Sequence, residues 1–308
     1  MEFIKSTKID FLGKRRPAMI ISGLLILAGI ISLVVKGGPN YSIDFVGGSE
    51  VHVRFNRPAP IDDIRKALGE VDLGSSEIKH FGAEEDILIR VEQQNTEKDI
   101  TQTILTTLQN KFPELEPTLL SAESVGPKIG KELRVSGILA VLVSLVLILI
   151  YIWFRFEFVF GIGAIAALFH DVLITLGLFS LLDYEISLSV VAAFLTIVGY
   201  SLNDTIVIFD RIRENIKIKR RETLLNILNL SINQSLSRTI ITSLTTLFVV
   251  LILFVNGGAV LHTFSFALLV GVIVGTYSSV FIASPVVLEW NNRQGTSQKP
   301  GKTSSKKR

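Results

Sequence analysis

The sequence predicts an α-helical polytopic membrane protein with six transmembrane helices and one α+β domain outside the cytoplasm. Hydrophobic residues make up 48% of its 308 residues, and the mean hydropathy of +0.49 is too high for an ordinary soluble protein. About 20 apolar residues suffice to cross the hydrocarbon core of a bilayer, so six apolar segments of that order predict six spans. They are 17–35, 135–154, 158–182, 186–210, 239–255 and 260–288.

The distribution of Lys and Arg predicts the orientation of these spans. Basic residues cluster in the amino-terminal arm, in the connection after the fourth span and in the carboxy-terminal tail. They are Lys5, Lys8, Lys14, Arg15 and Arg16 in the arm, Arg211, Arg213, Lys217, Lys219, Arg220 and Arg221 in the connection, and Arg293, Lys299, Lys302, Lys306, Lys307 and Arg308 in the tail. The short connections 183–185 and 256–259 contain neither Lys nor Arg. Cytoplasmic loops are enriched in these residues, so both termini are predicted to be cytoplasmic, and the pI near 9 requires no nucleic-acid partner.

This topology divides the chain into four parts. Residues 1–36 are the cytoplasmic arm and first transmembrane helix, and residues 37–134 are the extracytoplasmic domain, in which acidic residues outnumber basic ones. Residues 135–289 are a five-helix transmembrane bundle, and residues 290–308 are a basic cytoplasmic tail. The first span is long and no small-residue cleavage site follows it, so we do not expect a cleaved signal peptide.

The extracytoplasmic domain alternates strand and helix patterns. Val51, Val53 and Phe55 alternate with other residues, as in a strand with one buried face. The elements that follow are a helix from Ile61, strands at 76–81 and 86–92 around a turn at 82–85, a helix at 96–112 and a strand at 117–124. The second helix is expected to open at Thr96, with Asp99 in the capping-box position. The order β-α-β-β-α-β is that of a ferredoxin-like unit.

No cluster of residues in this domain points to catalysis. His52 and His80 are isolated in the sequence, and both are expected to be solvated strand histidines. The chain has no cysteine, which excludes disulfides and Cys-ligated metal sites. We therefore expect no enzymatic activity and no metal. A free edge of the sheet could instead bind an extended polypeptide by strand addition.

The fourth span contains a carboxylate, Asp204, inside an apolar stretch. Polar residues share one broad face of this helix at 3.6-residue spacing, namely Ser189, Thr196, Tyr200, Asn203 and Asp204. Asp204 lies six residues before Asp210 at the predicted cytoplasmic boundary, hence about 9 Å deep. A charge in hydrocarbon is costly and usually marks an ion path or proton relay. The alternative is a static buried ion pair that fixes the register of the helices.

The fifth span opens with Arg238, followed on one face by Thr242, Thr245 and Thr246. If the two helices adjoin, the long Arg238 side chain can reach the depth of Asp204. Alternatively, Arg238 is only an orientation anchor at the interface. The candidate ion-coupling residues are therefore Asp204, Arg238, Asn203 and Thr242.

The third and sixth spans carry small residues suited to close helix packing. These are Gly163, Ala166 and Ala167 with His170 in the third span, and Gly271 and Gly275 with Ser278 and Ser279 in the sixth. His170 and Asp171, beside the first group, form a weaker, secondary candidate relay. Adjacent residues point about 100° apart on a helix, so only one of them can face a given path squarely.

Several motifs resemble those of SecF, in the SecD/SecF family of bacterial protein-export membrane subunits. Residues 199–215 (GYSLNDTIVIFDRIREN) are similar to the fourth-span motif of that family, and residues 235–246 are similar to its fifth-span motif. Residues 43–48 (IDFVGG) resemble the motif after the first span, although Ser42 and Val46 stand where the family has Gly and Thr. Val125-Gly126-Pro127 with Gly130, and the His170-Asp171 pair, also fit.

The resemblance implies one six-helix half of an RND-superfamily complex, located in the bacterial cytoplasmic (inner) membrane. It implies a SecD-like partner subunit, cooperation with the SecYEG channel and SecA, with YajC and YidC as further partners, and an unfolded preprotein as substrate. The family uses the proton motive force, or sodium in some members, to promote late translocation and release. No cofactor is implied beyond the transported H⁺ or Na⁺. Asp204 and Arg238 occupy the matching ion-coupling positions.

Two other classes of protein fit part of the pattern. Half of a proton-coupled RND-type exporter of small molecules would use a similar relay, but would be expected to carry larger external domains than 49–125. A scaffold that only assembles other membrane proteins would have no need for Asp204.

Overall fold

The computed structural model describes residues 7–91 and 99–293. Lys5, the predicted helix start at Thr96 and the basic tail residues after Arg293 lie outside this part of the chain. The chain forms two compact units. The sheet unit comprises Tyr41–Ala140 and Glu185–Leu188, and the helix unit comprises Met1–Asn40, Val141–Tyr184 and Ser189–Arg308.

Six helices in the described part of the chain are long and apolar enough to cross a membrane, which confirms the predicted number of spans. The first five are α1 (Arg15–Val35), α5 (Pro127–Arg155), α6 (Phe158–Leu181), α7 (Leu188–Ile218) and α8 (Leu224–Asn256). The sixth runs through α9 (Gly258–Ser278), a π-helical turn (Ser279–Ala283) and α10 (Ser284–Arg293). Several helices exceed the predicted spans; α5 starts at Pro127 rather than 135, and α8 at Leu224 rather than 239.

The π-helical turn in the sixth span has an identifiable cause. Pro285 lacks a backbone N–H and cannot continue the α-helical hydrogen-bond ladder. The Ser284 hydroxyl also donates to the Ser279 carbonyl across this turn, at 3.1 Å.

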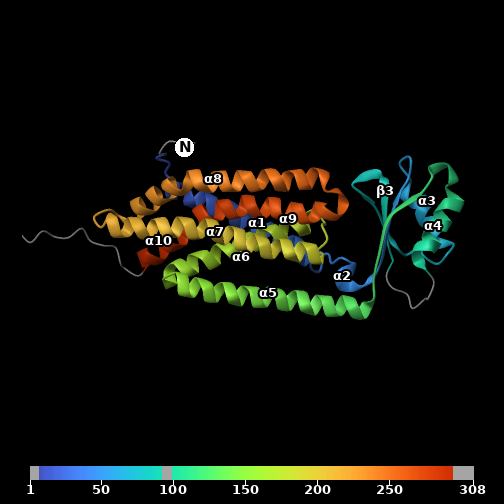
Figure 1. The fold of residues 1–308 in the computed structure, drawn as a ribbon, viewed down its shortest axis with the longest axis horizontal. Helices are drawn as coiled ribbons and strands as arrows, with labels where there is room; N and C mark the ends of the chain where they lie inside the picture. Colours follow the sequence, from blue (N-terminus) through green and yellow to red (C-terminus); the bar gives the residue numbers. More distant parts are fainter. Residues whose placement is uncertain (1–6, 92–98, 294–308) are drawn as a thin grey trace, which may run out of the picture. The chain divides into compact units, whose positions relative to one another are not determined.

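Within the helix unit, α1 packs against α6 and α8 packs against α9 (Figure 1). The α1–α6 crossing is close because Gly29 faces Gly177, and a Cβ atom built on Gly29 would lie 2.5 Å from the Gly177 Cα. An aromatic group of Phe156, Phe160 and Phe209 packs edge to face in the core.

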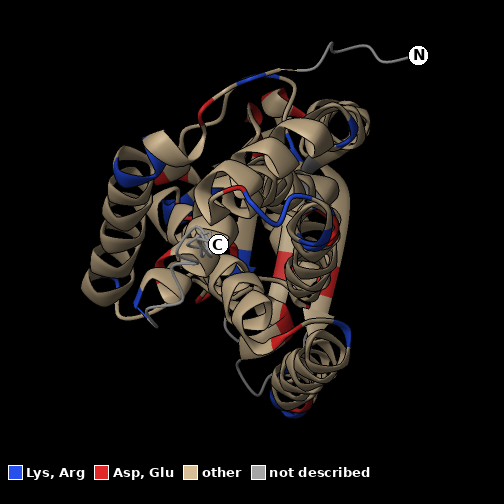
Figure 2. Cartoon of the chain, turned by 90° about the vertical axis from the view of Figure 1, so that its left-hand side faces the viewer, with Lys and Arg blue, Asp and Glu red and all other residues tan. Residues whose placement is uncertain are grey.

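The outer faces of the helices are apolar, and charges gather at the helix ends. Much of α1 and α5 exposes large hydrophobic side chains. Figure 2 shows Lys and Arg at helix ends and in the connections near them, whereas the spans themselves are mostly free of charge. The distribution fits helices that meet hydrocarbon along their length and polar surroundings at their ends.

The sheet unit has the predicted β-α-β-β-α-β order. Its elements are β1 (Gly48–Arg54), α3 (Ile61–Gly69), β2 (Glu77–Phe81), β3 (Ala83–Val91), α4 (Ile100–Lys111) and β4 (Thr118–Val125). The antiparallel sheet has the strand order β2-β3-β1-β4, which leaves β4 at one edge. Strand residues such as Val51 and Ile89 pack against Ile64, Leu68 and Ile104 of the two helices.

Three local predictions in this unit are corrected. Strand β3 begins at Ala83, so the turn after β2 is Gly82 alone, with φ of 87°. Asp99 is the N-cap of α4 and accepts a hydrogen bond from the Gln102 N–H at 3.2 Å, rather than occupying the third position of a capping box. His52 is buried on β1 and packs edge to face on Phe81, whereas His80 is exposed as expected.

The two glycine motifs pack backbone against backbone. Residues Ile43–Val46 form a short helix, α2, capped by Ser42, and Gly47 and Gly48 follow with φ of 80° and 124°. A Cβ atom on Gly48 would lie 2.7 Å from the Val91 carbonyl oxygen, and one on Gly130 would lie 3.0 Å from the Gly47 nitrogen. Glycine fits the turn at 47–48 without strain, because both space and backbone conformation exclude a side chain there.

Candidate functional site

The polar face predicted for the fourth span divides in the structure. Asp204 of α7 points inward and its side chain is only 2% exposed, whereas Asn203 and Thr196 are exposed. Neighbouring residues on a helix point about 100° apart, so the packing of α7 can bury one and expose the next. One of the two carboxylate oxygens of Asp204, Oδ2, is buried without a hydrogen-bond partner.

The polar neighbours of Asp204 come from α8 and α9. The Ser243 and Thr276 hydroxyls interact with its carboxyl group. The two hydroxyl oxygens also lie 2.7 Å apart, and the Tyr200 hydroxyl donates to Ser243 at 3.4 Å. Thr276 donates its own proton to the Val272 carbonyl at 2.7 Å. Two hydroxyls, one from α8 and one from α9, therefore lie beside the carboxyl group, and the Tyr200 hydroxyl of α7 extends this hydroxyl group through Ser243.

Neither Arg238 nor Thr242, both described residues, forms a hydrogen bond or ion pair with Asp204. Both Asp204 and Arg238 are described, and no ion pair joins them; Arg238 is exposed on the surface of α8, although its charge acts on the Asp204 carboxyl group. The Thr242 hydroxyl donates to carbonyls of its own helix, those of Arg238 and Thr239, at 3.1 and 3.0 Å. The structure thus does not contain the static Asp204–Arg238 pair that the sequence allowed.

His170 and Asp171 lie in a second buried network that connects α1, α6, α7 and α9. The His170 Nδ1 atom lies 2.8 Å from Asp171 Oδ1, and its Nε2 atom lies 2.9 Å from the Ser22 hydroxyl. Ser201 and Ser278 both donate to Asp171 Oδ2, at 2.5 and 2.8 Å.

The donors in this network can be assigned one after another. Tyr277 donates its single proton to the Ala18 carbonyl at 2.7 Å, so Ser22 must donate in its 3.0 Å hydrogen bond to Tyr277. Ser22 is then the acceptor from His170, which requires a proton on Nε2. The contact between His170 Nδ1 and Asp171 Oδ1 completes the network.

The two networks meet on α7 and α9. Ser201, which contacts Asp171, lies one helical turn before Asp204. Thr276 belongs to the hydroxyl group beside Asp204, while Tyr277 and Ser278 belong to the His170–Asp171 network. A Cβ atom on Gly275 would lie 2.9 Å from the Ser201 side chain, so this glycine allows α7 and α9 to approach closely.

Sequence reasoning missed the hydroxyl partners in both networks. Isolated Ser and Thr residues in apolar helices were the available signal, but such residues also serve plain packing. The hydroxyl partners that sequence reasoning missed are Ser22, Ser201, Ser243, Thr276 and Tyr277, and Ser278 was expected only to support helix packing. In the described part of the chain, no group of three or more His, Asp or Glu side chains could hold a metal ion.

Comparison with known proteins identifies the family. The family model described as protein export membrane protein SecD/SecF, C-terminal, matches residues 102–293, and the SecD/SecF GG motif matches residues 31–59. The chain is 47% identical to the protein translocase subunit SecF of Rhodothermus marinus, over 95% of this chain and 96% of that protein. It is 49% identical to the SecF subunit of Magnetococcus marinus, over 93% of each chain.

Two solved structures have the same fold. The crystal structure of SecDF, a translocon-associated membrane protein from Thermus thermophilus, superposes with a TM-score of 0.84 at 42% identity over 93% of this chain. SecDF in a super-membrane-facing form gives a TM-score of 0.69 at 40% identity over 95% of this chain. This chain spans 39% and 40% of those two longer chains. The coverage, the glycine motif and the six-helix fold together show that the chain belongs to the SecF family of protein-export membrane subunits.

Proposed function

We propose that this chain uses the proton or sodium motive force to promote translocation of preproteins across the cytoplasmic membrane and their release on the outer side. It acts as one half of a complex with a SecD-like subunit, beside the SecYEG channel and SecA, with YajC and YidC as further partners. The SecDF chains, of which this chain spans about two fifths, support a SecD-like partner. Both termini face the cytoplasm in this proposal, as the Lys and Arg distribution favours.

The observation that carries the proposal is the Asp204 carboxyl, buried among apolar helices with one oxygen unpartnered. A purely structural carboxylate would be expected to have its hydrogen bonds satisfied, because an unpaired buried charge is costly. A carboxyl group that binds and releases an ion must instead be stable both with and without the bound ion. Asp171 provides the contrast, since its carboxyl has three hydrogen-bond partners.

The hydroxyl protons around Asp204 suggest how ion release is coupled to movement. Thr276 donates to Val272, so Ser243 donates to Thr276, and Tyr200 donates to Ser243. A protonated Asp204 can donate to the remaining acceptor site on Ser243. An ionised Asp204 would need hydrogen-bond donors, but the Ser243 and Thr276 hydroxyls already donate their protons to other acceptors. Loss of the proton therefore requires these hydroxyls to rotate or a cation to approach, and either change involves α7, α8 and α9.

The exposed polar residues of α7 and α8 support a partner on that surface. Asn203, Arg238, Thr196 and Thr245 are exposed on helices that are otherwise apolar. Lipid would offer no hydrogen-bond partner to Asn203 or Arg238. We propose that helices of the SecD-like subunit cover them, and that Arg238 acts on Asp204 from the interface between the two halves.

The decisive test is Asp204→Asn in vesicles that contain the SecD-like subunit, with and without an imposed gradient. The amide keeps the shape of the side chain but cannot ionise, so gradient-dependent stimulation of preprotein export should be lost while partner association is retained. Separate proton and sodium gradients distinguish the two ions.

Asp210→Asn is the matched control. Asp210 is a carboxylate of the same helix, but it is half exposed and paired with Arg155 and Arg213. Exposed pairs contribute little, so this variant should keep its gradient dependence. Full gradient-dependent export by Asp204→Asn would show that the relay proposal is wrong.

A further inference from the structure

The four residues Glu185–Leu188 belong to the sheet unit although they follow α6 and lead into α7. Their backbone is held by residues at the start of the glycine motif. The Ser42 N–H donates to the Ile186 carbonyl at 3.0 Å, and Tyr41 and Ile186 form a parallel β-bridge. Asp44 Oδ2 accepts a hydrogen bond from the Leu188 N–H at 2.8 Å.

Leu188 is the first residue of α7, so Asp44 supplies a carboxylate to the amino-terminal end of that helix. The first N–H groups of a helix have no partner within the helix, and the positive end of the helix dipole favours a negative charge there. Asp44 therefore satisfies one of these groups from outside the helix. Asp204 lies sixteen residues further along α7, about 24 Å at the rise of an α-helix.

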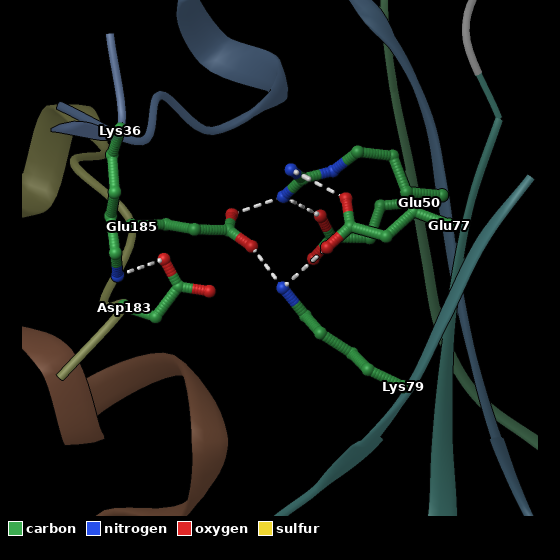
Figure 3. Close-up of polar contacts among 7 residues, drawn as sticks. Lys36, Glu50, Glu77, Lys79, Asp183 and Glu185 are labelled. Atoms are coloured by element: carbon green, nitrogen blue, oxygen red, sulfur yellow. Dashed lines mark hydrogen bonds and ion pairs between the residues drawn. The ribbon is translucent and has the colours of Figure 1, made fainter. Parts of the chain in front are cut away.

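Glu185 adds a side-chain connection to the sheet (Figure 3). Its carboxylate forms ion pairs with Arg90 of β3 and Lys79 of β2, and Figure 3 shows it pointing toward the Lys79 ammonium group. Glu185 and Arg90 are only 17% and 10% exposed, so solvent screens this pair less than a surface pair. Burial alone would lower the pKa of Lys79, but its hydrogen bond to Glu185 and the Glu185 charge hold that pKa above its ordinary value.

The sheet does not need Glu185 for charge balance. Arg90 also pairs with Glu50 at 3.0 Å and with Glu77 at 3.3 Å, and Lys79 pairs with Glu77 at 3.1 Å. The two cations thus already have two carboxylates from the sheet itself. What Glu185 adds is a connection between the sheet and the segment that precedes α7.

We propose that Asp44 and Glu185 are positioning residues that fasten the start of α7 to the sheet unit. A displacement of α7 when Asp204 changes its ion occupancy is then transmitted to the sheet unit, and a load on the sheet unit is transmitted back to α7. This inference rests on the proposed function, because it assigns a route between ion binding and the movement of exported polypeptide.

The first test measures whether these contacts hold the segment in place. The chain has no cysteine, so Tyr41→Cys with Ile186→Cys introduces a single pair at the β-bridge, where backbone spacing suits a disulfide. Oxidation of the full chain in membranes should form the bond readily. Adding Asp44→Ala with Glu185→Gln should slow its formation several-fold. Formation at an unchanged rate would overturn the inference.

Two matched variants are the controls. Asp44→Asn keeps an acceptor oxygen for the Leu188 N–H, since Asn caps helices about as well as Asp. Glu77→Gln removes pairs to the same two cations, but from within the sheet. Both variants should form the disulfide at nearly the rate of the chain that carries only Tyr41→Cys with Ile186→Cys. Slowing of disulfide formation by Glu77→Gln as large as that by Asp44→Ala with Glu185→Gln would contradict the special role of Glu185.

The second test measures function in vesicles with an imposed gradient. Asp44→Ala with Glu185→Gln should reduce gradient-dependent export several-fold. The disulfide introduced between positions 41 and 186 replaces the lost contacts covalently, so its oxidation should restore export. A reductant should abolish the restoration, which a general folding defect would not explain.

The outcomes of this test separate the inference from the function on which it rests. The positioning role would be refuted if the variant Asp44→Ala with Glu185→Gln formed the disulfide slowly but kept the gradient-dependent export of the wild type. If the proposed function is wrong, the Asp204→Asn variant will still show gradient-dependent export. The rates of disulfide formation do not depend on that result and can still be interpreted.

Discussion

At the scale of single residues, hydrogen-bond satisfaction distinguishes the two buried carboxylates of the helix unit. Asp171 accepts hydrogen bonds from two serines and is hydrogen-bonded to His170, which contacts Ser22, so this network connects four helices. Asp204 has one buried oxygen without a hydrogen-bond partner. The hydroxyls beside it donate their protons to other acceptors. The first arrangement suits a fixed connection between helices and the second suits a group that changes state. A relay role for His170 and Asp171 stays a prediction.

His52 supplies a pH-dependence prediction at the same scale. Burial lowers the pKa of His52 from its ordinary value of 6.5. Below that value the unfolded chain binds the proton more readily than the folded chain. The sheet unit should therefore keep its full stability above about pH 6.5 and lose stability as the pH falls from there to the lower, folded-state pKa.

Hydrogen exchange of the β1 and β2 amides at two pH values, corrected for the intrinsic exchange rate, measures this effect. The His52→Phe variant should show no difference in amide protection between the two pH values, because phenylalanine does not titrate. Its aromatic ring can still pack on Phe81. His80→Phe, at an exposed position on the neighbouring strand, should leave it unchanged. An equal pH dependence in the His52→Phe chain would disprove the assignment.

At the scale of secondary-structure elements, close backbone approach decides how the helices pack. Gly29 and Gly177 bring α1 and α6 together, and Gly275 brings α9 onto Ser201 of α7. Lipid-facing helices gain little from hydrophobic burial against each other, so van der Waals contact through small residues carries much of their association. In the sheet unit, Gly47 and Gly48 serve the same purpose between α2, β1 and the start of α5.

Gly29→Ala and Gly23→Ala, both on α1, test whether close backbone approach through glycine stabilises the packing of the helices. A Cβ on Gly29 would meet the Gly177 backbone at 2.5 Å, whereas one on Gly23 meets nothing within 4 Å. Overpacking of this kind costs about 1–3 kcal/mol, so Gly29→Ala should lower the thermal unfolding midpoint in lipid nanodiscs. Gly23→Ala should match wild type or exceed it, because alanine favours a helix over glycine. Equal midpoints for the two variants would show that the α1–α6 crossing tolerates a wider separation.

At the scale of the whole molecule, the chain combines a membrane-type helix unit with a ferredoxin-like sheet unit. The sheet unit is assembled from two stretches of sequence, since Glu185–Leu188 join it from the connection between α6 and α7. The chain therefore enters the helix unit from the sheet unit at two places, through α5 and through α7.

Reporter fusions test the predicted orientation. An enzyme active only outside the cytoplasm should work when fused at Asn95, in the acidic region between the first two spans. It should fail when fused at Lys219, because the connection between α7 and α8 carries the densest cluster of internal Lys and Arg. Activity at Lys219 would contradict a six-span topology with both termini in the cytoplasm. A cytoplasmic reporter at the same two sites should give the opposite pattern.

The sequence alone determined the features that depend on composition and local periodicity. Apolar segments revealed six spans, the alternation of strand and helix patterns revealed the order of the sheet unit, and the position of Asp204 in an apolar helix revealed an unusual carboxylate. The boundaries were less accurate, because helices such as α5 and α8 continue beyond their apolar parts. Only the tertiary structure decided that Asp204 is buried while Asn203 and Arg238 are exposed, since the rotation of a helix is set by its neighbours. The same holds for the hydroxyl partners Ser243 and Thr276, for the burial of His52 and for the attachment of Glu185 to Arg90, because each joins residues distant in sequence that only the packed chain brings together.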